Sequence, residues 1–334
     1  MRRVVYRAAV IGCGKIGSEF ADDPGLSGIY THTGAYSACP DTELVACCDR
    51  DAEKLETCGR KWGVTALYGD TKRLLAEQKP DIVSICTPDE THHALFIETL
   101  ESPSVKAVLM EKPLTTSLDH AVEIASLAEQ QHIVVAVNYG RRYADCFTRL
   151  QEYLRTGAVG EIQSVSGFYS KGTIHNGTHW LDAARFLIGD IVMVQGWDVR
   201  REKGPDPTLD AVLRFACGAG GHLVGCDSDA FAIFEMDIVG KKGRVRITKS
   251  GHQFDVYDAS NEPRGKSLKL LPAEKTSLLG GMQDMTLHAV EDLVWCLKSS
   301  GRQPRCSVGD GISALKAALA IVASAKSGSA VALV

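Results

Sequence analysis

A glycine-rich turn follows the first apolar segment of the chain and restricts how the chain can fold. Tyr6–Ile11 form a mostly apolar run, and Gly12–Gly17 follow it with the spacing G-x-G-x-x-G. In a strand–turn–helix unit, Gly12 permits a tight turn, Gly14 lets a diphosphate approach the backbone, and Gly17 allows close packing of helix on strand. Free N–H groups at the helix start favour an anion. The turn predicts a dinucleotide-binding unit; the alternative is a glycine turn that holds no phosphate.

The first 137 residues alternate between apolar strands and helices. Strands are expected at Tyr6–Ile11, Glu43–Cys48, Val64–Leu67, Asp81–Cys86, Val105–Met110 and Ile133–Val137. Periodicity and composition predict helices at Ala52–Trp62, Thr71–Gln78, His92–Leu100 and Ser117–Gln131. Strands that are apolar on both faces and alternate with helices form a parallel sheet covered on both sides. The sequence therefore predicts an α/β protein whose N-terminal domain, residues 1–137, is a Rossmann doubly wound parallel sheet.

An acidic residue ends the second predicted strand. Asp49 follows the apolar run Leu44–Cys48 and is expected to accept hydrogen bonds from the adenosine ribose of a dinucleotide. It lies 32 residues beyond Gly17, whereas the usual spacing is about 20. A glycine-containing stretch at residues 22–31 accounts for the excess as an insertion in the first crossover. Because the Asp49 carboxylate should repel a 2′-phosphate, NAD is expected to be preferred over NADP.

Composition argues against several classes of protein. With 334 residues the chain is long enough for two domains. Its formal net charge is −4 and it has no long basic run, so nucleic acid is not an expected partner. No uninterrupted apolar run approaches the roughly 18 residues of a membrane span, so no membrane association is expected. The 11 cysteines are scattered without a C-x-x-C pair, which is typical of reduced, core-filling cysteine in a cytoplasmic protein.

The fifth predicted strand ends in Glu111, Lys112 and Pro113. Ligands of parallel sheets lie beyond the carboxyl ends of the strands, so Lys112 could donate a hydrogen bond to a substrate oxygen during hydride transfer. Taken alone, the three residues could be an exposed ion pair at a strand end. Together with the glycine turn, Asp49 and the segment Thr87–His92, they resemble the Gfo/Idh/MocA family of nicotinamide-dependent oxidoreductases, which act mostly on sugars, inositols and nucleotide-linked sugars.

The resemblance covers the whole chain and implies a cofactor and a catalytic residue. NAD, with NADP as the alternative, is the implied cofactor, and Lys112 is the implied catalytic lysine. Glu111 could orient that lysine. The residues expected to bind the cofactor are Gly12, Gly14, Lys15, Ile16, Gly17, Asp49, Arg50, Thr87, Pro88, His92, Glu111 and Lys112.

After residue 137 the pattern changes to short strands joined by polar turns. Helices are expected at Tyr143–Thr156, Thr178–Ile188, Met282–Lys298 and Ile312–Ala325, and strands at Glu161–Tyr169, Met193–Val199, Leu209–Cys217, His222–Asp227, Ala232–Val239 and Arg244–Ile247. This predicts a C-terminal α+β domain, residues 138–334, with a large open, mostly antiparallel sheet. The resemblance implies that this domain serves substrate binding and oligomerisation. Helices should cover one sheet face, and the other is expected to support contacts in a homodimer or homotetramer.

Two histidines lie four residues apart at the start of one of these helices, with His175 before the helix and His179 in its first turn. The family pattern is an aspartate, three residues and a histidine that opens a helix; His179 matches the histidine, whereas His175 stands where aspartate is usual. The resemblance implies proton transfer at His179, with His175 as a second candidate, and the alternative is a buried histidine bonded to backbone. Asn176 and Gly177 favour a helix cap over a helix interior, and no third ligand has motif spacing, so no metal is expected.

Polar residues after the sixth strand complete the predicted substrate site. Asn138, Arg141 and Arg142 could bind sugar hydroxyls or a phosphate, or they could be a solvated link. The residues expected to bind substrate are Lys112, Asn138, Arg141, Arg142, Lys171, His175, Asn176 and His179. The sequence thus predicts an NAD(P)-dependent sugar or nucleotide-sugar dehydrogenase or reductase. A sugar-sensing regulator that binds the cofactor without redox turnover and an NAD-dependent glycosidase are the alternatives.

Overall fold

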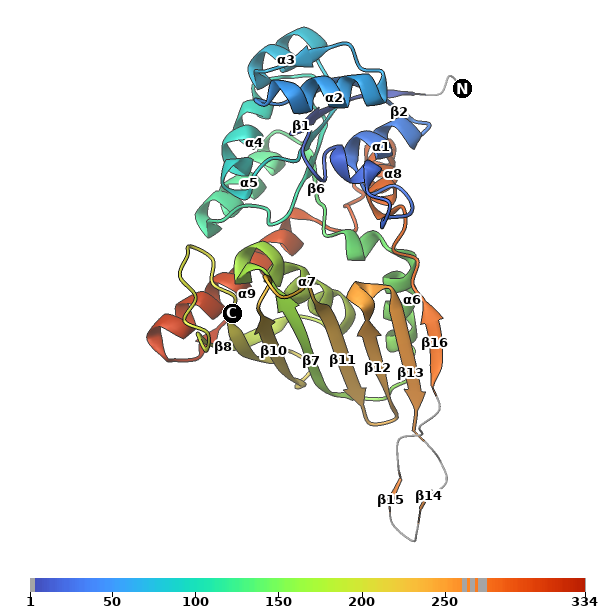
Figure 1. Cartoon of the computed structure of the whole chain (residues 1–334), viewed down its shortest axis with the longest axis vertical. Helices are drawn as coiled ribbons and strands as arrows, with labels where there is room; N and C mark the ends of the chain where they lie inside the picture. The colour runs from blue at the N-terminus through green and yellow to red at the C-terminus, as the bar shows by residue number, and fades with distance from the viewer. Residues whose placement is uncertain (1–3, 260–262, 265–267, 270–274, 334) are drawn as a thin grey trace. The chain divides into compact units, whose positions relative to one another are not determined.

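A computed structural model of the chain describes residues 4–259, 263–264, 268–269 and 275–333 (Figure 1). The chain forms two compact units. The first contains Met1–Ala144 and Gln283–Ile312, and the second contains Asp145–Met282 and Ser313–Val334. The domain boundary that the sequence suggests, after residue 137, stays a prediction, because the contacts also assign a late segment of the chain to the first unit.

The first unit contains a six-stranded sheet in the order β3-β2-β1-β4-β5-β6, and all its neighbouring strands are parallel. The strands are β1 (Tyr6–Ile11), β2 (Thr42–Cys48), β3 (Leu67–Tyr68), β4 (Ile82–Ile85), β5 (Ala107–Met110) and β6 (Val134–Val137). Every residue of β4 and β5 is buried, as expected for central strands covered on both faces. The order reverses between β1 and β4. This confirms the predicted doubly wound sheet and places the expected ligand position beyond the carboxyl ends of these two strands.

Helices of the first unit begin and end where local signals occur. They are α1 (His32–Ala38), α2 (Ala52–Trp62), α3 (Thr71–Gln78), α4 (His92–Leu100), α5 (Leu118–Gln130) and α8 (Met285–Lys298). The Asp51 side chain caps α2 by accepting from the N–H groups of Glu53 and Lys54. Gly63 ends the same helix in a left-handed conformation with φ of 69°. The bounds of α2, α3 and α4 match the predicted ranges.

The first crossover differs from the prediction, because no α-helix follows the glycine turn directly. A 3-10 helix occupies Glu19–Asp22, and α1 begins only at His32. The N–H groups of His32 and Thr33 donate to the carbonyls of Ile16 and Gly17, each at 3.1 Å. The insertion therefore interrupts the helical turn that starts at the glycines, and α1 continues it. This arrangement brings His32, the first residue of α1, next to the glycine turn.

The insertion packs against the start of α8, which comes from the late segment of the chain (Figure 1). The N–H of Ile29 donates to Asp284 Oδ1 at 2.7 Å. The Thr286 hydroxyl donates to the carbonyl of Tyr30 at 2.8 Å. Residues some 255 positions apart in the sequence thus hold the insertion in place. No local pattern in the sequence indicates this contact.

The second unit contains a nine-stranded sheet in the order β16-β13-β12-β11-β7-β10-β9-β8-β17. Its strands are β7 (Ile162–Ser170), β8 (Ile191–Trp197), β9 (Asp210–Phe215), β10 (Gly220–Cys226), β11 (Phe234–Gly240), β12 (Gly243–Thr248), β13 (Gln253–Asp258), β16 (Thr276–Leu279) and β17 (Val331–Ala332). Among these described strands, β7 and β10 pair in parallel and the other neighbours are antiparallel, which confirms a mostly antiparallel sheet. Sequence analysis missed β13, β16 and β17, which are short or polar. A separate ribbon pairs β14 (Pro263–Arg264) with β15 (Leu268–Lys269).

Helices α6 (Asp145–Arg155), α7 (Gly177–Ile188) and α9 (Val308–Ser327) accompany this sheet, although α9 begins in the first unit. Trp180 of α7 is fully buried, and its indole N–H donates to the carbonyl of Glu235 at 2.9 Å. A Cβ on Gly167 of β7 would lie 2.4 Å from the indole nitrogen, so glycine is required for this close approach. On β8, the N–H of Gly196 donates to Ser324 Oγ of α9 at 2.9 Å. These contacts fix both helices to the sheet.

Helix α9 is long and apolar enough, by length and composition, to cross a membrane, with a mean hydropathy of 1.4. Its residues Ala314, Leu315 and Ile321 are nevertheless fully buried inside the protein. Core helices of globular proteins can have the same length and composition. We therefore describe α9 as a core helix.

Candidate active site

The glycine turn has the geometry of a phosphate cradle. Gly12 has a φ of 98°, and a Cβ there would lie 2.7 Å from the backbone of Cys86. A Cβ on Gly17 would lie 2.0 Å from the carbonyl oxygen of Gly12. By contrast, a Cβ on Gly14 would meet no atom within 4 Å. Gly12 and Gly17 are thus required by packing, whereas Gly14 faces open space, as a turn that admits a diphosphate requires.

Asp49 is joined directly to this turn. Its Oδ2 accepts from the N–H of Cys13 at 2.7 Å, and its Oδ1 accepts from the N–H of Asp51 at 2.9 Å. The side chain is half-buried, whereas the neighbouring Arg50 is exposed. A carboxylate held beside the glycine turn at the end of β2 can accept hydrogen bonds from a ribose. The residues present therefore fit a dinucleotide, whose adenosine diphosphate part Asp49 and the glycine turn would hold.

His92 connects two turns at the carboxyl edge of the sheet. Its Nδ1 lies 2.9 Å from the carbonyl oxygen of Pro113, and its Nε2 lies 2.9 Å from that of Thr87. The side chain is fully buried. His92 thus ties the turn after β4, which contains Thr87 and Pro88, to the turn after β5. Direct contact of His92 with the cofactor stays a prediction.

Glu111 lies at the centre of a buried polar cluster that sequence analysis missed in part. Glu111 Oε1 lies 2.9 Å from His32 Nε2 and accepts from Asn138 Nδ2 at 2.7 Å. His32 is fully buried, and Asn138 is 5% exposed. Asn138 Oδ1 is buried and has no hydrogen-bond partner among the described residues. An acceptor left open at the end of β6 suits a donor on a bound ligand.

The cluster keeps Glu111 ionised. Burial alone would raise the pKa of Glu111, but the His32 hydrogen bond and charge, the Lys112 charge and the Asn138 hydrogen bond together lower that pKa below its ordinary value. Burial, and then the Glu111 charge, raise the pKa of the adjacent Cys86 thiol well above its ordinary value. Cys86 therefore stays neutral, and Glu111 carries the negative charge of the cluster.

Lys112 follows Glu111 at the carboxyl end of β5 and is half-buried. Its backbone N–H donates to Glu111 Oε2 at 3.2 Å, and the Lys112–Pro113 peptide bond is cis. The two carboxylate oxygens of Glu111 thus have different tasks, since Oε1 binds His32 and Asn138 while Oε2 faces the Lys112 backbone. This arrangement is more specific than an exposed ion pair at a strand end.

Arg142 lies in a structural ion pair. Its Nη2 lies 3.0 Å from Asp310 Oδ1, and its side chain is 8% exposed. Its Nη1 donates to the carbonyl of Arg305. The interpretation of this segment as a solvated link is therefore wrong for Arg142. Substrate binding by Arg142 and by the half-buried Arg141 stays a prediction.

In the second unit, His175 and His179 fall where the sequence placed them relative to α7. A single π-helical turn, Gly172–Asn176, contains His175, and His179 lies in the first turn of α7. Both side chains are half-buried. Asn176 Nδ2 donates to the carbonyl of Ser170 at 2.9 Å, so its side chain does not cap α7 as its position suggests.

Asp206, which sequence analysis missed, holds the backbone at His175. Its carboxylate accepts from the N–H of Ile174 at 2.7 Å and from the N–H of His175 at 2.8 Å. A Cβ on Gly172 would lie 2.1 Å from Asp206 Oδ2, so only glycine permits this approach. Lys171, the exposed residue before this turn, has a left-handed φ of 71°. No local sequence pattern predicts the role of Asp206, because its contact with the His175 backbone joins two loops that are distant in the chain.

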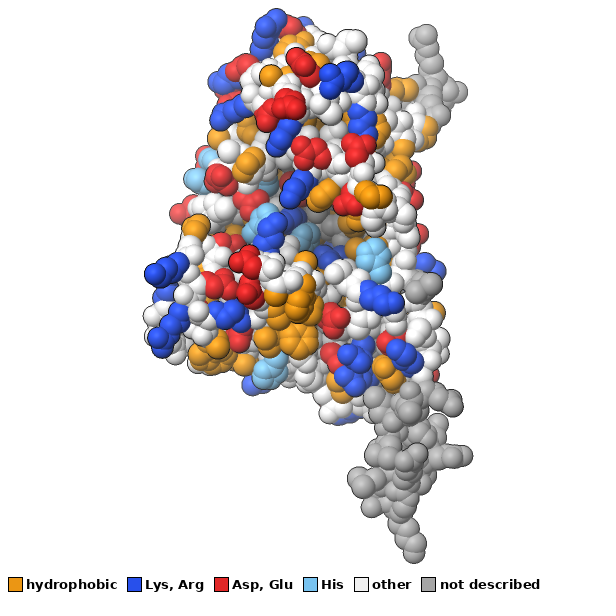
Figure 2. Space-filling model, viewed as in Figure 1, with side chains coloured by type: hydrophobic (Ala, Val, Ile, Leu, Met, Phe, Trp, Pro, Cys, Tyr) orange, Lys and Arg blue, Asp and Glu red, His pale blue; other side chains and the backbone are white. Residues whose placement is uncertain are grey.

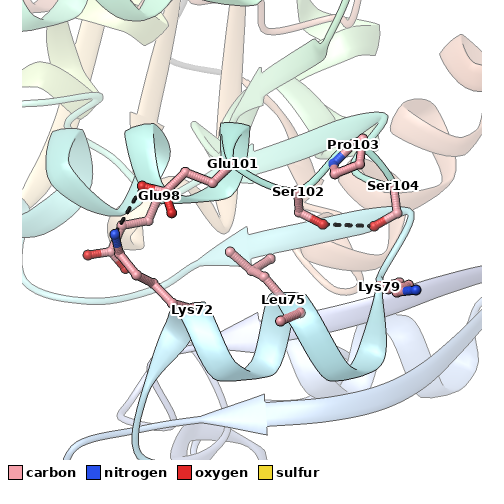
Figure 3. Close-up of a pocket in the computed structure, with 9 residues that line it drawn as sticks. Lys72, Leu75, Lys79, Glu98, Glu101, Ser102, Pro103 and Ser104 are labelled. Atoms are coloured by element: carbon pink, nitrogen blue, oxygen red, sulfur yellow. Dashed lines mark hydrogen bonds and ion pairs between the residues drawn. The ribbon is translucent and has the colours of Figure 1, made fainter.

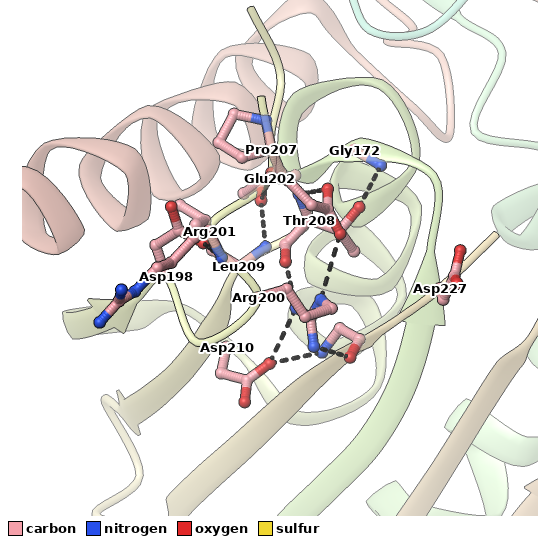
Figure 4. A network of polar contacts seen from close by, with 12 residues as sticks. Gly172, Asp198, Arg200, Arg201, Glu202, Pro207, Thr208, Leu209, Asp210 and Asp227 are labelled. Carbon is pink, nitrogen blue, oxygen red and sulfur yellow. Dashed lines mark hydrogen bonds and ion pairs between the residues drawn. The ribbon is translucent and has the colours of Figure 1, made fainter. Parts of the chain in front are cut away.

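A polar network fixes the loop that carries Asp206 (Figure 4). Arg200 donates to the carbonyl of Thr208 and lies 3.1 Å from Glu202 Oε1 and 3.2 Å from Asp210 Oδ1. Glu202 Oε2 accepts from the N–H of Thr208 at 2.7 Å. The Thr208 hydroxyl accepts from the N–H of Gly172 at 3.0 Å. The loop between β8 and β9 is therefore anchored to the turn that precedes the two histidines.

Within the part of the chain that the structure describes, a group of three cysteines has a geometry that could suit a metal ion. The sulfur atoms of Cys13, Cys47 and Cys58 lie within 4.8 Å of one another and are almost completely buried. They pack with Leu55 and Val64 in an apolar cluster. Thiolates there would place uncompensated charge in a hydrocarbon environment. We therefore interpret this group as core packing; the two histidines are not part of it.

A cavity of about 380 Å³ lies between α3 and α4, away from the carboxyl edge (Figure 3). Its rim contains the exposed ion pair of Lys72 with Glu101, 3.0 Å apart. Ser102 and Ser104, whose hydroxyls lie 3.0 Å apart, line it just before β5 begins. It therefore lies at the amino ends of the strands, opposite the glycine turn and Lys112. Its position excludes it as the dinucleotide site.

These features define a dinucleotide-binding protein of the dehydrogenase class. Two family models match the chain: "Oxidoreductase family, NAD-binding Rossmann fold" over residues 6–139 and "Oxidoreductase family, C-terminal alpha/beta domain" over residues 172–333. The chain belongs to the Gfo/Idh/MocA family of NAD-binding oxidoreductases. The resemblance inferred from the glycine turn, Asp49 and Glu111-Lys112-Pro113 is thereby confirmed.

Individual relatives are distant. The chain is 27% identical over 202 residues to the D-glucoside 3-dehydrogenase of Escherichia coli (strain K12), a match that covers 55% of this chain and about half, 54%, of that protein. It is 23% identical over 352 residues to a D-apiose dehydrogenase of Paraburkholderia graminis, covering 98% of this chain and 90% of that protein. A levoglucosan dehydrogenase solved with NADH and levoglucosan has a TM-score of 0.81 at 19% identity, covering 98% and 99% of the two chains, and shares the fold.

Proposed function

We propose that this protein catalyses NAD-dependent oxidation or reduction at a hydroxyl or keto carbon of a sugar, an inositol or a nucleotide-linked sugar. The observation that carries the proposal is the position of Lys112 at the carboxyl end of β5, where its backbone N–H donates to buried Glu111. Strand β5 lies two strands from the glycine turn on the same edge of the sheet. The dehydrogenases of D-glucosides and D-apiose among the relatives support the substrate class.

The chain's own groups would move the proton. NAD, when bound, accepts or supplies the hydride. In the oxidative direction the Lys112 amine takes the proton of the substrate hydroxyl, and in the reductive direction its ammonium returns that proton. We assign His179 as the second proton-transfer group. His175 then acts as a hydrogen-bonding group for the substrate in place of the usual aspartate.

The direct test is a panel of free sugars, inositols and nucleotide-linked sugars, with NADH formation followed by absorbance. We expect at least one member to support steady NAD reduction by the purified protein. Tight NADH binding without turnover on any member would favour the alternative function, a sugar-sensing regulator that binds the cofactor without redox turnover. Release of an aglycone from a glycoside without net NADH would identify the glycosidase.

We predict that NAD is preferred over NADP by at least about tenfold in kcat/KM, a difference of ~1.4 kcal/mol. The Asp49 carboxylate beside the glycine turn should accept from ribose hydroxyls and repel a 2′-phosphate. Asp49→Asn isolates the charge, because its carbonyl oxygen can still accept from the Cys13 N–H. This variant should reduce the preference for NAD, mainly by raising kcat/KM with NADP. Equal or better kcat/KM with NADP in the parent protein would contradict the assignment of Asp49.

We propose that two or more copies associate through the open face of the nine-stranded sheet. Phe168 of β7 and Val224 of β10 are in register on this face, and both are at least 36% exposed. Trp197 of β8 is 42% exposed. Figure 2 shows hydrophobic side chains gathered over β7 and β10. We expect a dimer or tetramer by sedimentation, and Phe168→Asp should shift it toward monomer; a monomeric parent protein would contradict this prediction.

We propose a cytoplasmic location. All 11 cysteines are free, and nine of them are buried. Free thiols in this number suit a reducing compartment. Fractionation of cells that express the tagged protein tests the proposal.

A further inference from the structure

Asn138 carries a buried acceptor that no group in the described part of the chain uses. The residue directly follows β6 at the carboxyl edge of the six-stranded sheet, and its side chain is 5% exposed. Its Oδ1 atom is buried without a hydrogen-bond partner among the described residues. An unpaired buried acceptor destabilises a folded protein, so native structures seldom keep one without a use. The open acceptor therefore indicates a ligand that supplies a donor.

The Glu111 carboxylate determines which end of the Asn138 amide is left open. Asn138 Nδ2 donates to Glu111 Oε1 at 2.7 Å and lies 3.3 Å from His32 Nε2. Rotating the amide by half a turn would bring Oδ1 against Oε1, and two buried acceptors would then face each other. The lowered pKa of Glu111 keeps it ionised, so it has no hydrogen to donate to Oδ1. The open atom is thus the amide oxygen, which can only accept.

The backbone holds Asn138 in place independently of its side chain. The N–H of Asn138 donates to the carbonyl of Met110 at 2.8 Å, which extends the pairing of β5 with β6 by one residue. The N–H of Tyr139 donates to the carbonyl of Val137 at 2.8 Å, so a tight turn is centred on Asn138. Separate hydrogen bonds therefore fix the main chain and the amide. An acceptor held in this way is preorganised for its ligand.

The strand order places this acceptor on the substrate side of the cofactor. The glycine turn and Asp49 follow β1 and β2, whereas Asn138 follows β6, three strands from β1 in the order β1-β4-β5-β6. Neighbouring strands lie about 4.8 Å apart, so roughly 14 Å of sheet separate β6 from the strand of the diphosphate cradle. Lys112, the proposed proton-transfer group, lies one strand nearer to the cradle. A ligand group at Asn138 would thus lie beyond the reacting carbon, as seen from the diphosphate.

We propose that Asn138 Oδ1 accepts a hydrogen bond from a second hydroxyl of the substrate, so that the enzyme requires a polyol. The inference rests on the proposed function, in which Lys112 acts on the first, reacting hydroxyl. A hydroxyl is the fitting donor, because it is small enough for an enclosed position and always has a hydrogen to donate. A keto, deoxy or methoxy group at the same carbon has no O–H hydrogen. Such an analogue would leave Oδ1 buried and unpaired, and a polar site rejects an analogue in this way.

The test combines Asn138→Ser with the removal of single hydroxyls from the substrate. The serine hydroxyl can still donate to Glu111, whereas the amide oxygen is lost. The probes are methyl D-glucopyranoside, myo-inositol and the monodeoxy analogues of both. Each probe is titrated into protein saturated with NADH, where oxidation of the probe cannot proceed. The change in NADH fluorescence gives the dissociation constant, so this readout does not depend on turnover.

We expect one hydroxyl to differ from all the others. Its removal should raise the dissociation constant at least about tenfold for the parent protein and less than about twofold for Asn138→Ser. Removal of any other hydroxyl should change both proteins by the same factor. The same pattern should appear in kcat/KM when NAD replaces NADH. Equal factors for every hydroxyl would show a merely structural role and overturn the proposal, as would a parent protein that binds neither complete probe.

Gln78→Ser is the matched control, since it also removes a half-buried amide of the first unit. Gln78 ends α3, and its Nε2 donates to the Tyr68 hydroxyl at 2.7 Å. Its carbonyl accepts from Arg7 near the start of β1, which places it at the amino edge of the sheet, opposite Lys112. For every probe, the factors of Gln78→Ser should equal those of the parent protein.

Acetylpyridine adenine dinucleotide distinguishes the substrate from the cofactor as the donor. Its acetyl group replaces the nicotinamide carboxamide and has no N–H. We expect the parent protein and Asn138→Ser to bind this analogue and NAD in the same ratio. If the parent protein binds the analogue more weakly than NAD and Asn138→Ser binds both equally, Oδ1 accepts from the carboxamide and the proposal is wrong.

The outcomes also separate this inference from the proposed function. If one hydroxyl is coupled to Asn138 in the binding titration but Lys112→Met retains turnover, the acceptor role of Asn138 stands and the catalytic assignment of Lys112 fails. If Lys112→Met abolishes turnover but no hydroxyl is coupled to Asn138, the proposed function stands and the polyol requirement fails.

Discussion

Lys112→Met should abolish turnover and leave cofactor binding nearly intact. The glycine turn and Asp49 would hold the dinucleotide at β1 and β2, whereas Lys112 lies at the end of β5. The substitution removes the group that exchanges a proton with the substrate oxygen. Such groups contribute about 10²–10⁴ in rate, so kcat should fall at least about a hundredfold. The dissociation constant for NADH, measured by fluorescence titration, should change by less than about tenfold, or ~1.4 kcal/mol.

Lys106→Met is the matched control for this experiment. Lys106 immediately precedes β5, at the opposite end from Lys112, and forms an exposed ion pair with Asp81 at 2.7 Å. Its loss should leave kcat within about twofold, because exposed ion pairs contribute little. His179→Ala should lower kcat less than Lys112→Met, because the lysine could still polarise the substrate oxygen. Near-normal turnover in Lys112→Met would make the catalytic assignment wrong and favour the regulator.

Gly17→Ala should both destabilise the first unit and abolish cofactor binding. The new Cβ would lie 2.0 Å from the Gly12 carbonyl oxygen, which belongs to the backbone and cannot rotate away. Overpacking costs typically 1–3 kcal/mol, and a clash with backbone should reach the upper end, about 3 kcal/mol in the free energy of unfolding. Denaturant unfolding followed by circular dichroism measures this loss.

Gly14→Ala separates binding from folding. Its Cβ would meet no protein atom within 4 Å, so the free energy of unfolding should stay within about 0.5 kcal/mol of the parent value. The same methyl group would stand where the diphosphate must approach, so the dissociation constant for NADH should rise at least about tenfold. Unchanged NADH affinity in Gly14→Ala would show that the open space above this turn does not hold the cofactor.

Local sequence signals were sufficient for the six strands of the Rossmann unit and for its helices α2, α3, α4 and α5. Buried parallel strands and amphipathic helices differ in periodicity, and the helices α2, α3 and α4 accordingly match their predicted bounds. Asp49 and the Glu111-Lys112 step could be found because the carboxyl ends of parallel strands meet at one edge. Because each of these residues directly follows a strand of the parallel sheet, all of them lie at the same edge of that sheet.

Signals were weaker where an element is short or interrupted. The helix α1 lacks a long apolar period, and the insertion separates it from the glycine turn whose helix it continues. Strand β13, with the sequence Gln-Phe-Asp-Val-Tyr-Asp, is polar at alternate positions and takes its place by pairing with β12 and β16. Strand pairing of this kind is decided by partners distant in the sequence.

The sequence by itself determined the fold class, the glycine turn, Asp49, Lys112 and the positions of His175 and His179 relative to α7, because each depends on spacing within one or two elements. Tertiary structure alone decided the surroundings of these residues. His32 reaches Glu111 across 79 positions of the chain, and Asp206 reaches the His175 backbone across 31. A hydrogen bond requires atoms within a few tenths of an ångström of a fixed distance and angle. Periodicity can assign a residue to a face or an end of an element, but only the packing of several elements sets that geometry.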